Sequence, residues 1–117
     1  MKAILLPLLV ALGSAAVPAH VNERGMDYTP YKDHRGVPCC SDVHCRPATA
    51  FVDSTESGRS VVRLLIDGEW FSVSRYFVVA EDATDGRAHW CGRTVIAGGS
   101  AKPVPVPFCI ILPPRTM

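Results

Sequence analysis

The sequence predicts a mainly β fold: a small, disulfide-stabilised antiparallel sheet with an irregular N-terminal arm and little helix in the mature chain. Three observations lead to this expectation. Two β-prone runs flank the dipeptide Asp67-Gly68, five cysteines follow a leader-like N-terminus, and no long segment keeps a helical stripe of apolar side chains.

Residues 1–19 have the layout of a secretory signal peptide. Lys2 supplies the positive charge, an apolar stretch follows, and Val17 and Ala19 are the small residues of a cleavage site. We expect cleavage near Ala19, with cleavage after Ala16 as the alternative. The apolar stretch is shorter than the roughly 18 to 20 residues of a membrane span. The chain is therefore expected to be exported, periplasmic or secreted, without a stable membrane span.

The roughly 100 residues that remain after cleavage suit one domain with a small core. Residues 20–46 are expected to form an irregular cysteine-containing arm, because Pro30, Gly36 and Pro38 interrupt a polar stretch without apolar periodicity. Residues 47–117 are expected to form the small β domain.

The first elements of this domain are a short strand and a hairpin. Residues 47–53 alternate as a strand, and residues 54–58 indicate a turn. Asp67-Gly68 suits a two-residue type I′ turn, which makes residues 60–73 a β-hairpin and fixes its register. The predicted pairs are Ile66 with Glu69, Leu64 with Phe71 and Val62 with Val73 on the core side, and Leu65 with Trp70 on the other side.

The hairpin's outer tryptophan, Trp70, could be an exposed binding patch. We prefer the interpretation that the N-terminal arm covers it. Tyr28 and Tyr31 of the arm could help to cover the core.

The later elements are less regular. Residues 76–80 could continue a strand or form one helical turn, and the carboxylates of the following turn, which include Asp85, are expected to be solvated. A strand over residues 87–96 would place His89 and Cys91 on one side and Trp90 on the other. The proline-rich residues 102–107 predict an extended edge segment that leads into a last strand at residues 108–112.

The five cysteines are the chemical centre of the sequence. An exported protein keeps disulfides, but an odd number cannot all pair within one chain. A bond between the adjacent Cys39 and Cys40 would strain a small ring, so we expect these two to form bridges in different directions. Two pairs with one cysteine left over are expected, and the left-over thiol could link two copies into a homodimer. The sequence does not choose the pairing among Cys39, Cys40, Cys45, Cys91 and Cys109.

Three stretches resemble small exported proteins of alphaproteobacteria that share a Cys-Cys-x4-Cys-Arg-Pro motif. The matching stretches are 39–47, then Asp-Gly-Arg-Ala-His-Trp-Cys at 85–91, then Cys109 followed by Pro113 and Pro114. The resemblance implies export and a shared cysteine framework with an odd count, and it implies no activity. His44 stands where this group usually has Asp.

Four residues are candidate metal ligands, because their types suit Zn²⁺ or Cu⁺: His44, Cys45, His89 and Cys91. Their spacing lacks a Cys-x-x-Cys pair, and bridging explains the thiols better. We therefore commit to no metal and no cofactor, and we interpret His89 as a structural histidine.

The sequence offers no catalytic pattern. A serine-hydrolase elbow, a phosphate-binding glycine loop and a Cys-x-x-Cys redox motif are all lacking. We do not expect an enzyme.

The charge of the chain also limits which class of partner is expected. The 12 Lys and Arg residues nearly balance 11 Asp and Glu residues without a block of either sign. Nucleic acid is excluded as an expected partner, because its binding needs a concentrated basic face. The sequence thus favours an exported binding or structural module for an unknown protein or small ligand. The alternative is a periplasmic metal- or thiol-redox-handling protein that uses the Cys and His residues.

Overall fold

The structure is a computed structural model that describes residues 21–41, 43–96, 98 and 102–115. The predicted signal peptide, residues 1–19, and its cleavage site at Ala19 lie outside the described residues. The described part is mainly β, as the sequence predicts.

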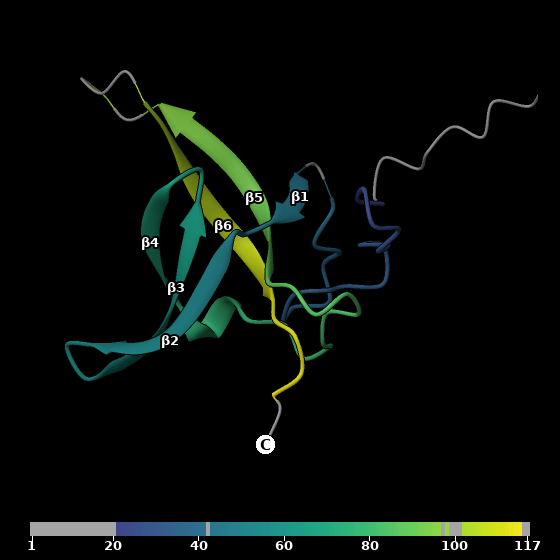
Figure 1. The fold of residues 1–117 in the computed structure, drawn as a ribbon, viewed down its shortest axis with the longest axis horizontal. Coiled ribbons are helices and arrows are strands. Elements are labelled where there is room, and N and C mark those ends of the chain that lie inside the picture. The colour runs from purple at the N-terminus through teal and green to yellow at the C-terminus, as the bar shows by residue number, and fades with distance from the viewer. Residues whose placement is uncertain (1–20, 42, 97, 99–101, 116–117) are drawn as a thin grey trace, which may run out of the picture.

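Within the described residues, six strands form two three-stranded antiparallel sheets (Figure 1). One sheet has the order β1-β5-β6 and the other the order β2-β3-β4. The strands are β1 (His44–Pro47), β2 (Ala50–Glu56), β3 (Arg59–Ile66), β4 (Glu69–Ser74), β5 (His89–Ile96) and β6 (Pro103–Ile111). A 3₁₀ turn, η1 (Arg75–Phe77), follows β4.

The predicted hairpin is confirmed as β3 and β4. Asp67 and Gly68 both have positive φ, 51° and 82°, as a type I′ turn requires. Every predicted pair is observed, from Ile66 opposite Glu69 to Val62 opposite Val73. On the predicted core side, Val62, Leu64, Ile66 and Val73 are buried, while Phe71 is partly buried and Glu69 is exposed.

A second tight hairpin joins β2 to β3, and here the sequence-based turn at residues 54–58 is wrong in extent. Strand β2 runs on to Glu56, and the turn consists of Ser57 and Gly58 with φ of 51° and 77°. Ser-Gly supplies the same pair of positive φ values in two residues. The polar residues before it can therefore stay in the strand.

The other sheet includes residues that the sequence assigns to the arm. Strand β1 pairs with β5 and places Cys45 opposite Cys91. The proline-rich segment and the last predicted strand form one strand, β6, with a register shift between Cys91 and Gly92. The short run after β4 becomes η1 and a bridge from Val78 to Ile110.

Two apolar cores lie on opposite faces of the β1-β5-β6 sheet. Alternation along β5 sends Trp90 toward the β2-β3-β4 sheet and Cys91 toward the arm. Tyr28 and Tyr31 are buried in the arm-side core, as anticipated. Figure 1 accordingly shows the β1-β5-β6 sheet between the other sheet and the arm.

This layering corrects the expectation for Trp70. The arm is bonded through Cys39 to Cys109 on β6, so it covers the sheet to which Trp70 does not belong. The Trp70 side chain is 43% exposed, and the Arg63 guanidinium lies 5.3 Å from its ring centre.

Candidate functional site: three sulfur atoms

One disulfide joins the arm to β6, and a second joins β1 to β5 within the same sheet. Cys39 is bonded to Cys109, and Cys45 is bonded to Cys91. The cysteine without a bridge is Cys40. The adjacent pair does not bond to itself, but the expectation that both of its members form bridges is wrong for Cys40.

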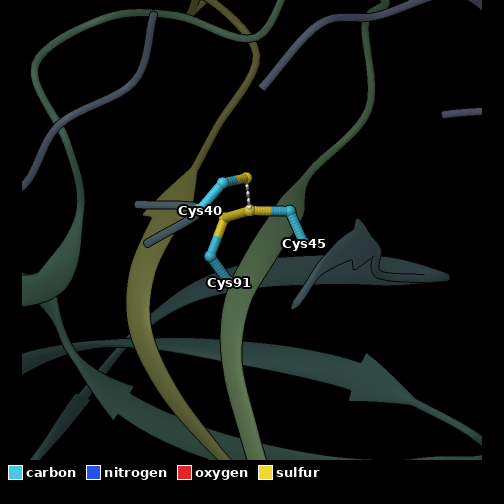
Figure 2. A group of neighbouring side chains, drawn as sticks. All are labelled: Cys40, Cys45 and Cys91. Atoms are coloured by element: carbon cyan, nitrogen blue, oxygen red, sulfur yellow. Dashed lines mark hydrogen bonds between the residues drawn. A yellow bond between two sulfur atoms is a disulfide. The ribbon is translucent and has the colours of Figure 1, made fainter. Parts of the chain in front are cut away.

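The free thiol lies against one of these disulfides. Cys45 and Cys91 are directly opposed on β1 and β5, with Cα atoms 4.0 Å apart, so their side chains meet on the arm-facing side. The arm brings the Cys40 Sγ to 2.7 Å from the Cys45 Sγ (Figure 2). This distance is well below ordinary contact between non-bonded sulfur atoms. The three sulfurs therefore form one cluster, with all of them within 4.8 Å of one another.

Burial raises the pKa of the Cys40 thiol, the free thiol of this cluster. Cys91 is fully buried, whereas Cys40 and Cys45 are partly buried beside the arm-side core. Burial, with the charge of Asp27 adding to it, raises the pKa of the Cys40 thiol to about 11. Cys40 is therefore almost entirely a neutral thiol near pH 7, and its nucleophilic thiolate is a small fraction.

His89 belongs to a separate buried network. Its Nδ1 lies 2.7 Å from the Tyr28 hydroxyl and its Nε2 lies 2.7 Å from Asp85 Oδ1. A carboxylate only accepts, so Nε2 carries a proton and donates it to Asp85, while Nδ1 shares a hydrogen bond with the Tyr28 hydroxyl. Asn22 donates to the Tyr28 oxygen and to Asp85. Both nitrogens of His89 are thus occupied, which fits the structural interpretation of this residue.

The network shifts the pKa values of its two acidic groups in opposite directions. Burial, with the nearby charge of Asp85, raises the pKa of Tyr28 to about 12 against the hydrogen bond from Asn22. Burial alone would raise the pKa of the Asp85 carboxyl, but the hydrogen bonds from His89 and the Arg87 amide outweigh it and hold this pKa below its usual value. The sequence-based interpretation of Asp85 as a solvated turn residue is wrong. In the sequence, only the spacing of four residues between Asp85 and His89 indicates that the two side chains could pair.

The four residues of the sequence-based metal set do not come together. His44 precedes Cys45 on β1, so its side chain points to the opposite face of the strand, where it is exposed. His89 is held by Tyr28 and Asp85. Cys40, which that set omits, takes their place beside Cys45 and Cys91.

An aromatic hollow is lined by none of the three clustered cysteines. It has a volume of about 350 Å³ and is lined by His34, Tyr76 and Phe108 among others. The rings of His34 and Tyr76 are 5.0 Å apart, and Tyr76 is largely exposed.

Comparison with known proteins gives no match for this chain among protein-family models, curated proteins or solved structures. Among the described residues, no helix has the length and apolar character needed to cross a membrane.

Proposed function

We propose that this chain is an exported binding module that joins its partner covalently through the Cys40 thiol. The observation that carries the proposal is the place of that thiol, partly accessible and 2.7 Å from a disulfide sulfur. The partner is a protein or small molecule that bears a disulfide.

The bond-forming step is an ordinary thiol–disulfide exchange. Cys40 loses its proton to solvent, and its thiolate attacks one sulfur of the partner's disulfide. A Cys40–partner S–S bond forms, the partner's own S–S bond breaks, and the released partner thiolate takes up a proton. No net oxidant or reductant is needed.

Two properties of the chain support this role. Two disulfides suit a small domain in an oxidising compartment, where partner disulfides also persist. The raised pKa of Cys40 makes its attack slow. Slow attack suits lasting attachment better than rapid turnover of disulfides.

The test is to isolate the protein from the periplasm of its host without reductant, after blocking free thiols with N-ethylmaleimide. We expect an adduct at Cys40 that Cys40→Ser abolishes and that the neighbouring control Ser41→Ala retains. A Cys40–Cys40 link would mean that the Cys40 thiolate of a second copy had displaced the first partner's thiolate from the adduct, which would identify a second copy as the final partner. If Cys40 carries only the maleimide in every preparation, the proposal is wrong.

Soft-metal binding is a second candidate, because three sulfurs within 4.8 Å suit a thiolate site. It requires that a dithiol first reduce the Cys45–Cys91 bond, which yields two thiols while the dithiol becomes a disulfide. Titration of the reduced protein with Zn²⁺ against a chelator would test it. Cys40→Ser should weaken binding at least about tenfold, since it removes one of three ligands, and His44→Ala should not. Equal affinity of both variants would exclude this site.

A further inference from the structure

We infer that the free thiol moves between Cys40 and Cys91 by exchange within the sulfur cluster. The Cys40 sulfur attacks Cys45, and the bridge changes from Cys45–Cys91 to Cys40–Cys45. The inference rests on the proposed function in that both use the Cys40 thiol, and it adds a means of regulating that thiol.

The geometry favours Cys45 as the sulfur that is attacked. The Cys40 Sγ lies 2.7 Å from the Cys45 Sγ, and the dashed contact in Figure 2 joins these two atoms. The sulfur of Cys91 is then the leaving group. The Cys39–Cys109 bridge, which joins the arm to β6, takes no part and continues to hold the arm.

The exchange balances without any outside reagent. The Cys40 thiol releases its proton, the Cys40–Cys45 bond forms and the Cys45–Cys91 bond breaks. The Cys91 thiolate takes up one proton, so the chain keeps two disulfides and one thiol throughout. Its equilibrium is therefore independent of the redox potential of the compartment.

The two isomers differ in what they present to a partner. With the thiol at Cys40, the reactive group is partly exposed on the arm. With the thiol at Cys91, it is fully buried under the arm, where no partner can reach it. The exchange also replaces the staple between β1 and β5 with a short local loop. In the molecules that have exchanged, the thiol can therefore no longer bond to a partner, and the edge strand β1 is held less tightly.

Mapping the free thiol in the isolated, oxidised protein tests the inference. The protein is incubated at pH 9, then quenched with N-ethylmaleimide in acidic guanidinium, which stops exchange, and digested with trypsin. Cleavage after Arg87 and Arg93 puts Cys91 in a peptide of its own, residues 88–93. We expect about 1 to 10% of the label on Cys91, the population of an accessible minor state, and the remainder on Cys40.

The Cys40→Ser variant supplies the background, because it has no thiol to exchange. Label on Cys91 that does not exceed this background would overturn the inference. Label on Cys45 instead would overturn the assigned direction of attack.

A second variant tests the new bond directly. In Cys91→Ser, the structure leaves Cys40 and Cys45 facing each other, and we expect them to bond when the protein folds under oxidising conditions. If Cys40 and Cys45 bond, the folded variant should have no thiol that reacts with N-ethylmaleimide. If they do not bond, it should have two. Two reactive thiols in folded Cys91→Ser would contradict the inference.

These measurements use no partner. A missing partner adduct would therefore refute the proposed attachment and leave the internal exchange standing. Conversely, an adduct on a protein whose thiol never leaves Cys40 would refute only the exchange.

Discussion

At the scale of single residues, the Cys40 thiol is controlled by burial. Its pKa of about 11, against an ordinary value of 9.0, leaves about 100-fold less thiolate at neutral pH. We expect iodoacetamide to modify Cys40 slowly, with a rate that rises about tenfold per pH unit from pH 7 to pH 10. The guanidinium-unfolded protein is the control, and its rate should level off near pH 9. A folded-state rate that levels off at the same pH would show that burial does not control this thiol.

The buried network of Asp85, His89 and Tyr28 gives a second prediction at this scale. The folded-state pKa of Asp85 is depressed below the ordinary 3.8, so its contribution to stability is present above about pH 4 and is lost as the pH falls through the lower folded value. Asp85→Asn should cost about 1 to 2 kcal/mol of unfolding free energy at pH 7. As the pH falls below the ordinary 3.8, this difference should shrink.

Urea unfolding of both proteins at pH 7 and at acidic pH measures this effect. Glu81→Gln is the matched control, because Glu81 is an exposed carboxylate in the same turn. A deficit for Asp85→Asn that stays constant with pH would argue that the carboxylate charge plays no part in the network.

At the scale of elements, the shape of the β5–β6 ribbon depends on Gly92. The register shift beside it brings the β6 backbone so close that an added Cβ would lie 2.2 Å from the Val106 carbonyl oxygen and 2.8 Å from the Pro107 Cα. Both atoms belong to the backbone and cannot rotate away. Gly92→Ala should therefore destabilise the protein by about 2 to 3 kcal/mol in thermal or urea unfolding.

The control for this substitution is Gly98→Ala, because an added Cβ at Gly98 meets nothing within 4 Å. It should change stability by less than about 0.5 kcal/mol. If both variants lose the same stability, the close approach at the bulge is not the cause.

Elements whose structure is determined by neighbouring residues could be predicted from the sequence, and elements that depend on distant residues could not. The β3–β4 hairpin was predictable pair by pair because Asp67-Gly68 fixes its turn within two residues. Strand β1 was not, since its four residues form a strand only by pairing with β5, which lies far along the chain. The same sheet order determines that Cys45 meets Cys91 and that Cys40 is left free. The network at His89 likewise needs Tyr28, which is 61 residues away.

At the scale of the whole molecule, the part of the arm before β1 is held on the sheet by one disulfide, by buried tyrosines and by polar contacts such as that of Asn22 with Asp85. Cys39–Cys109 spans 70 residues and Cys45–Cys91 spans 46. Loop-closure entropy assigns each bridge about 4 kcal/mol, with a difference between them of about 0.4 kcal/mol. Removing either bridge should thus cost nearly the same global stability, while only one of them ties down the arm.

Trypsin can separate these two roles, because the arm carries its own cleavage sites at Arg24, Lys32 and Arg35. In the double variant Cys39→Ser/Cys109→Ser, the arm keeps only contacts such as Tyr31 to the Asp82 carbonyl, 2.8 Å. Local opening then needs less free energy than global unfolding, so we expect cleavage in the arm at least about tenfold faster than in Cys45→Ser/Cys91→Ser. Mass spectrometry of the first fragments, with urea unfolding of both variants alongside, measures this. Equal arm cleavage at equal stability would mean that the buried tyrosines, and not the Cys39–Cys109 disulfide, hold the arm on the sheet.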